Sequence, residues 1–149
     1  MKIVVITSNS LRHKYLACKL KNQKEINLKK VYFEDNLSAR LKNYQNKRIK
    51  NHFNERNLYE KGLFQNYVNL NHESIKTIKK EILNINDNLI INQIKKIKPV
   101  FIICYGTSLL KENFINAFYN KIINIHLGLS PYYKGVATNF FPILDRKPE

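Results

Sequence analysis

The sequence has only two cysteines and no long apolar run, and these scarcities exclude whole classes of protein. No stretch approaches the length of a membrane span, and the apolar start at residues 3–6 lacks the length and order of a signal peptide. Cys18 and Cys104 have no histidine or cysteine at metal-binding spacing, so we interpret both as small core residues and expect no metal site. These features favour a cytoplasmic protein without a membrane segment.

Acidic residues are also scarce, since 11 Asp and Glu stand against 26 Lys and Arg, which gives a net charge of +15. Clustered cations of this kind can bind the phosphates of nucleic acids. However, Asn, Lys and Ile together make up roughly two-fifths of the chain, which indicates a general compositional bias. No RNP-type motif or zinc pattern accompanies the lysines. We therefore favour a solvated lysine-rich surface over a functional basic patch.

The length of 149 residues and the hydrophobic content of 44% predict a single domain over residues 1–149. An apolar strand at residues 2–7 is followed by a turn at residues 8–10 and by a helix that begins near Leu11. Residues 28–33 form a second strand candidate that ends at Glu34 and Asp35, and we expect it to pair in parallel with the first.

The remaining pattern predicts further helices and strands around a charged excursion at residues 36–72, which we interpret as part of the same domain. Beyond it we predict helices at residues 73–83, 88–97 and 109–119, and strands at residues 100–106 and 121–125. Thr107 and Ser108 can cap the helix that follows them. This alternation predicts a doubly wound α/β fold with a mostly parallel sheet and helices on both faces.

Ligands of such sheets bind beyond the carboxyl ends of the strands. The loops at residues 8–10, 105–108 and 124–135 all fall at such ends, so one cleft could collect them. No GxGxxG motif follows the first strand, which argues against an ordinary dinucleotide site.

Asn124 and His126 lie two residues apart in a predicted strand, so they should point to the same face, with Ile123 and Ile125 on the opposite, packed side. An imidazole can take or give a proton, and a carboxamide can donate a hydrogen bond to a developing oxyanion, as acyl transfer to an amine requires. No serine or cysteine lies in a nucleophile elbow, which favours direct attack by the substrate. For His13, His52 and His72 we expect a structural role with the imidazole bonded to backbone.

The segment INIHLGLSPYYKGVATNFFPIL resembles the signature of the folate-dependent formyltransferases, and KIKPVFIICYGTSLL is similar to the strand and loop that precede it in that family. The resemblance covers essentially the whole chain and is most specific from Lys98 onward. It implies a Rossmann-like domain that uses 10-formyltetrahydrofolate as the formyl donor.

The resemblance also implies roles for individual residues. Asn124 would donate to the oxyanion and His126 would act in polarisation and proton transfer. Cofactor binding is expected at Tyr105, Gly106, Thr107 and Ser108, and substrate binding at Ser8, Asn9, Ser10, Gly128 and Tyr133.

The chain departs from the family pattern at two points. Gly128 stands where many members have a serine, and the third catalytic residue of the family, an aspartate beyond a further strand, would lie after Glu149. We therefore expect the sequence to be truncated before that aspartate. We also expect it to be inactive as written and to have an exposed sheet edge beside residues 121–126 that promotes self-association.

The acceptor amine is not specified by these motifs. The opening TSNSLRHKYLACKL and the loop HLGLSPYYKG resemble the less typical branches of the family more than its tRNA enzyme, which favours a small amine such as an amino sugar nucleotide. A methionyl-tRNA formyltransferase-like activity, a catalytically silent relative and a basic RNA-binding protein remain as alternatives.

Overall fold

The computed structural model describes residues 1–35, 47–129, 132–133 and 141–146, and it contains one five-stranded sheet. The strands are β1 (Lys2–Ser8), β2 (Asn27–Glu34), β3 (Lys79–Ile82), β4 (Phe101–Tyr105) and β5 (Ile122–Asn124). Their order across the sheet is β3-β2-β1-β4-β5, and every neighbouring pair is parallel. The predicted α/β fold class is therefore confirmed, including the parallel pairing of the first two strands.

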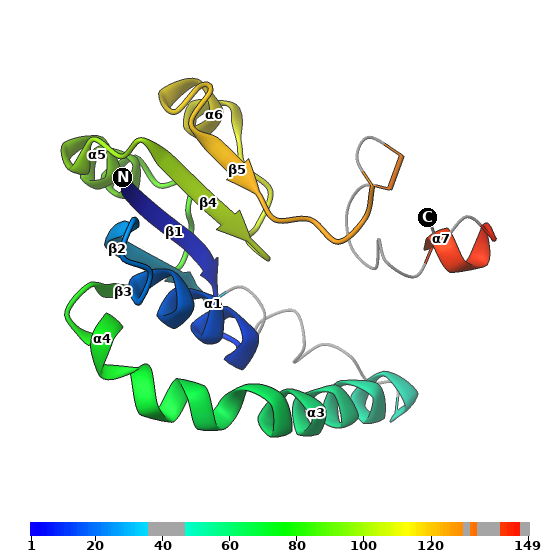
Figure 1. The fold of residues 1–149 in the computed structure, drawn as a ribbon. Coiled ribbons are helices and arrows are strands. Elements are labelled where there is room, and N and C mark those ends of the chain that lie inside the picture. The colour runs from blue at the N-terminus through cyan, green and yellow to red at the C-terminus, as the bar shows by residue number, and fades with distance from the viewer. Residues whose placement is uncertain (36–46, 130–131, 134–140, 147–149) are drawn as a thin grey trace.

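Helices cover both faces of this sheet (Figure 1). One face carries α5 (Asn88–Ile97) and α6 (Glu112–Ala117), and the other carries α1 (Leu11–Lys21), α3 (Lys47–Asn71) and α4 (Glu73–Lys76). A short helix, α7 (Phe141–Leu144), lies apart from the sheet near the carboxyl terminus. The chain progresses from β1 through β2 to β3 and then returns to place β4 on the opposite side of β1, so the topological switch point lies between β1 and β4.

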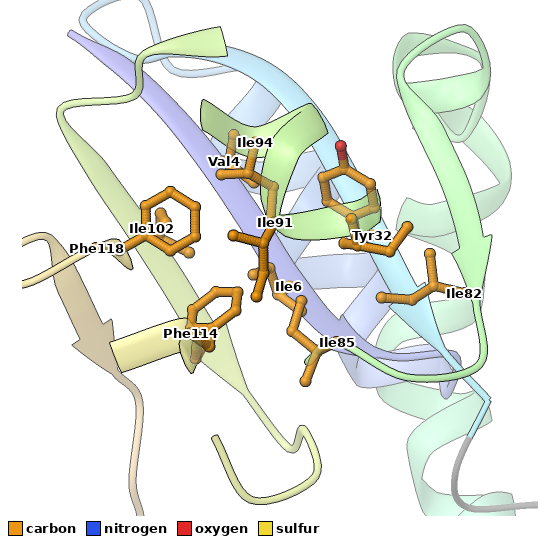
Figure 2. Close-up of a cluster of buried hydrophobic side chains, with 12 residues drawn as sticks. Val4, Ile6, Tyr32, Ile82, Ile85, Ile91, Ile94, Ile102, Phe114 and Phe118 are labelled. Atoms are coloured by element: carbon orange, nitrogen blue, oxygen red, sulfur yellow. The ribbon is translucent and has the colours of Figure 1, made fainter. Parts of the chain in front are cut away.

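Two apolar cores result from the alternation of side chains along β1. Val4 and Ile6 face α5 and α6, where they pack with Ile91, Ile94 and a cluster of further apolar residues (Figure 2). Ile3 and Val5 point to the other face and pack with the residues of α1 and α4, which include Ala17, Cys18 and Ile75. Both faces of the central strands are therefore buried, as a parallel sheet requires.

The long helix α3 occupies part of the predicted excursion, and it is more regular than the charged sequence indicated. Tyr15 of α1 contacts Phe64 and Tyr67 of α3 with ring centroids 4.7 and 5.0 Å apart. Arg12 of α1 also pairs with Glu60 of α3. The remainder of the excursion, with its helical spacing at Leu37, Leu41 and Tyr44, lies outside the described residues.

The predicted helix at residues 73–83 was wrong beyond its first turn. Only α4 is helical there, and Lys79–Ile82 instead forms β3, which pairs with Val31–Glu34 of β2. Ile75 and Ile82 then belong to different cores on opposite faces of the sheet. Hydrogen bonding along the edge of β2 outweighed the helical spacing of the isoleucines.

Two smaller predictions also needed correction. The helix expected at residues 109–119 is shortened to α6, whose N-cap residue is Lys111, so Thr107 and Ser108 do not cap it. Ile123 and Ile125 do not pack as expected, because β5 lies at the edge of the sheet and their side chains are 45% and 37% exposed. It is Ile122 that packs against the core of α5 and α6.

We predict that Ile94→Ala lowers the free energy of unfolding by about 2–5 kcal/mol, because Ile94 is fully buried between α5 and the sheet. Leu89→Ala on the same helix is the matched control, since Leu89 is 70% exposed and its loss should change stability by less than about 0.5 kcal/mol. Urea unfolding of the two variants measures the difference. Equal costs would contradict the assignment of this face of α5 to the core.

Candidate functional site

The carboxyl ends of β1, β4 and β5 lie next to one another, because β1 pairs with β4 and β4 pairs with β5. The Thr7 hydroxyl donates a hydrogen bond to the carbonyl oxygen of Tyr105 at 2.7 Å, which joins the ends of β1 and β4. The Ile125 N–H donates to the carbonyl oxygen of Cys104 at 2.8 Å, which extends the contact between β4 and β5. The predicted site loops after β4 and β5 therefore begin at adjacent points at the carboxyl end of the sheet, and the turn after β1 lies beside them.

Asn124 and His126 are both exposed at the end of β5. Nε2 of His126 lies 2.9 Å from the carbonyl oxygen of Tyr133. A carbonyl can only accept, so Nε2 carries the proton and Nδ1 holds the lone pair of the neutral ring. The contact thus orients the imidazole with Nδ1 as its basic atom.

Tyr133 continues this contact toward the carboxyl-terminal part of the chain. Its hydroxyl donates to Oδ2 of Asp145 at 3.1 Å, and partial desolvation of the hydroxyl together with this hydrogen bond raises the pKa of Tyr133. Gly128 is buried in the loop between His126 and Tyr133. The Tyr133 backbone carbonyl therefore holds the His126 ring, and the Tyr133 hydroxyl forms a hydrogen bond with Asp145.

The turn after β1 is organised around His13, for which the predicted position and hydrogen-bond partner were wrong. Instead of bonding to backbone at a strand end, His13 lies in α1, is 1% exposed, and has its Nδ1 2.6 Å from the hydroxyl oxygens of both Ser8 and Ser10. Its ring meets Tyr105 edge to face at 4.4 Å between centroids. Burial, with smaller contributions from the Arg12 and Arg56 cations, lowers the pKa of His13 to about 3. The ring is therefore neutral at physiological pH.

The loop after β4 fits closely over this histidine. Gly106 has a φ of +64°, and a Cβ atom at this position would lie 2.8 Å from Nε2 of His13. Only glycine adopts this conformation without strain and leaves room for the ring. Nε2 of His13 has no hydrogen-bond partner among the described residues.

Ser108 is held by a residue to which the sequence assigned no role. The carboxylate of Glu34 at the end of β2 accepts from the Ser108 N–H and from the Ser108 hydroxyl, both at 2.8 Å, and it is 1% exposed. An acidic residue that ends a buried strand is the signal that could have drawn attention to it. For His13 that signal was its position three residues after Ser10, within the first turn of α1.

Not all predicted residues face the same space. Asn9 lines a groove of about 350 Å³ on the β3 side of the turn, together with Lys14, Gln65, His72 and residues of α1, α3 and β3. That groove includes neither Asn124 nor Tyr105. Within the described residues no group of three or more metal-ligating side chains occurs, and no helix there is long and apolar enough to cross a membrane.

Comparison with known proteins shows which family this chain resembles. A family model described as Formyl transferase matches residues 1–140. A methionyl-tRNA formyltransferase from Finegoldia magna is 34% identical over 68 residues, which cover 44% of this chain and 22% of that protein.

Solved structures with the same fold include phosphoribosylglycinamide formyltransferases. The enzyme from Anaplasma phagocytophilum has a TM-score of 0.59 at 15% identity, and that from Brucella melitensis has a TM-score of 0.58 at 15% identity. Each match covers 97% of this chain but only 58% and 66% of the respective enzymes. The chain thus spans about three-fifths of the length of these enzymes.

We predict that Gly106→Ala lowers the free energy of unfolding by about 1–3 kcal/mol, because the new methyl group meets the His13 ring and the residue keeps a positive φ. The double variant Gly106→Ala/His13→Ala should cost less than the sum of the two single variants, since removing the ring makes room for the methyl group. Thermal or urea unfolding of all four proteins measures this coupling. Strict additivity would show that the two residues do not contact each other.

We predict that His13 makes the protein less stable in acid. Its pKa is about 3 in the folded chain against an ordinary value of 6.5, so between these pH values the unfolded chain binds one more proton. The free energy of unfolding should therefore fall as the pH is lowered from about 6.5 toward 3, by up to ~1.4 kcal/mol per pH unit from this residue. Urea unfolding at pH 6.5 and 5 should give a shallower slope for His13→Asn than for the unmodified chain. Identical slopes would show that the buried ring is protonated when folded.

Proposed function

The chain belongs to the formyl transferase family, and from this premise we propose that it transfers a formyl group from 10-formyltetrahydrofolate to the amine of a substrate. The observation that carries the proposal is the placement of Asn124 and His126, both exposed, at the end of a strand whose neighbour leads directly into the loop at residues 105–108. A donor bound between these loops would have a carboxamide and an oriented imidazole beside it.

The residues present suit a folate in their chemistry. Folates carry a flat ring system, and the loops after β4 and β5 offer exposed apolar side chains. Leu109 is 87% exposed, and Leu127 and Leu129 are 65% and 58% exposed. Tyr105, Gly106, Thr107 and Ser108 would hold the donor, whose formyl carbon is the electrophile of the reaction.

The chain's own residues would then act on the acceptor and on the developing charge. The amine nitrogen attacks the formyl carbon, so a C–N bond forms to the acceptor while the bond to the donor nitrogen breaks. Nδ1 of His126, which holds the ring's lone pair, would take the proton that the amine loses, and the Asn124 carboxamide would donate to the carbonyl oxygen as it gains negative charge. The lost proton can return through His126 to the donor nitrogen.

For the acceptor we propose a small amine such as an amino sugar nucleotide. Support comes from the opening and loop sequences, which resemble branches of the family other than the tRNA enzyme. The methionyl-tRNA formyltransferase relative and the net charge of +15 favour tRNA as the second candidate. Parallel assays with an amino sugar nucleotide, glycinamide ribonucleotide and methionyl-tRNA would decide among them.

We predict that His126→Ala and Asn124→Ala each reduce formyl transfer by about two to three powers of ten in the natural protein that contains this chain. Both side chains are exposed, so the melting temperature should hardly change. Transfer of an isotope-labelled formyl group measures the loss. Leu89→Ala on α5 is a control for an exposed side chain away from these loops, and near-normal turnover of either of the first two variants would show that the motif has been misread.

A further inference from the structure

Glu34 joins two loops at the carboxyl edge of the sheet that are far apart in the sequence. Its Oε1 atom accepts from the Ile85 N–H at 2.9 Å, in the loop after β3, and from the Ser108 hydroxyl, while Oε2 accepts from the Ser108 N–H, in the loop after β4. Because β1 separates β2 from β4, these two strands lie about 10 Å apart, and the Glu34 side chain connects β2 to the loop that follows β4. Three donors thus converge on one buried acid.

The loop after β3 strengthens this bridge through Asn86. Its side chain donates to the carbonyl oxygen of Leu109 at 3.0 Å and accepts from the Lys111 N–H at 2.7 Å. Its own carbonyl oxygen accepts from the Asn113 side chain at 2.9 Å. The segment from Ser108 to Lys111 is therefore fixed by side chains of β2 and of the loop after β3, and it does not form the first turn of α6.

Stability alone gives little reason for a carboxylate at this position. Glu34 forms no ion pair with a Lys or Arg in the described part of the chain, although the chain has 26 of these residues. Burying a carboxylate is costly, and replacing buried charges by apolar residues is often neutral or stabilising. Burial, with a smaller contribution from the nearby Glu34, raises the pKa of Cys104 to about 12. A buried acid without a cationic partner is better explained by the geometry that it imposes.

That geometry falls on the loop to which we assign the formyl donor. Tyr105 is anchored at one end by Thr7 and by the His13 ring, and Ser108 is anchored at the other end by Glu34. Gly106 and Thr107 span the two anchors, and the Thr107 side chain forms no hydrogen bond among the described residues. Their backbone position is therefore set by the two anchors.

We propose that Glu34 is a positioning residue for the formyl donor, acting through Ser108. Its carboxylate sets the path of residues 106–108 and so the surface that this loop presents to the folate. The proposal rests on the proposed function for the identity of the ligand, but the effect of Glu34 on the loop can be measured without any ligand.

The first test is amide hydrogen exchange in Glu34→Gln. The amide oxygen of the variant can still accept the two hydrogen bonds that Oε1 accepts, but its NH₂ group replaces Oε2 and would face the Ser108 N–H, so that bond is lost. We expect exchange at the Ser108 N–H to accelerate by about tenfold or more, whereas the N–H of Ile91, bonded within α5 to Asp87, keeps its rate. Glu60→Gln is the matched control, because Glu60 is also buried but lies between α1 and α3.

The second test is binding of 5-formyltetrahydrofolate, a stable folate, by calorimetry at a temperature at which every variant is folded. Glu34→Gln should weaken binding by about tenfold, and Ser108→Ala, which removes only the hydroxyl bond, by roughly two- to fivefold. Glu34→Asp should restore part of the affinity, because it keeps both acceptor oxygens. Glu60→Gln should bind as the unmodified protein does, even if it is equally destabilised.

The outcomes separate the two claims. Unchanged Ser108 exchange in Glu34→Gln, or equal loss of affinity in Glu34→Gln and Glu60→Gln, would overturn the positioning role. If the unmodified protein binds no folate, the proposed function fails, and the exchange rates then decide whether Glu34 sets the loop. Should Glu34→Gln not fold, Ser108→Ala replaces it in the binding measurement, and normal affinity of that variant would refute the proposal.

Discussion

The structure depends on one buried carboxylate, that of Glu34, at the carboxyl ends of the parallel strands, where the loops leave the sheet. Parallel strands end with backbone groups that the sheet no longer satisfies, and each loop that leaves the edge must find partners for its N–H groups. The Glu34 carboxylate accepts hydrogen bonds from N–H groups of both the loop after β3 and the loop after β4. The segment at residues 107–111 is consequently neither helix nor strand, and α6 begins only after Lys111.

The two halves of the candidate site are built in opposite ways. The loop after β4 is anchored by buried groups, with Gly106 pressed against His13 and Ser108 held by Glu34. The strand β5 is a three-residue edge strand. Asn124 at its end and His126, two residues further on, are both exposed. The loop after β4, which we assign to cofactor binding, is therefore fixed by buried contacts. Asn124 and His126, which we assign to oxyanion binding and proton transfer, are exposed instead. The contact between His126 and the carbonyl oxygen of Tyr133 orients the imidazole.

Local signals in the sequence predicted some elements with accuracy. The helix α5 has the expected bounds because Asp87 caps its first turn, Lys98 ends it in a left-handed conformation and Pro99 follows. Other features depended on residues distant in sequence. The strand β3 exists because β2 offers it hydrogen bonds, and the packing side of β5 is set by its place at the edge of the sheet. Glu34, named only as the end of a strand, acquires its role from Ser108, 74 residues away.

The hydrogen bonds that a neutral His13 ring can form limit which serine of the turn after β1 is free to contact a substrate. Two hydroxyl groups lie 2.6 Å from the same Nδ1 atom, yet a neutral imidazole offers there either one lone pair or one proton. Only one serine can therefore donate to the ring, and the other hydroxyl proton must find a different acceptor. Ser8 is fully buried, whereas Ser10 is partly exposed at the start of α1. Of the two serines, Ser10 is thus the one whose hydroxyl can turn toward a substrate while Ser8 keeps the histidine in place.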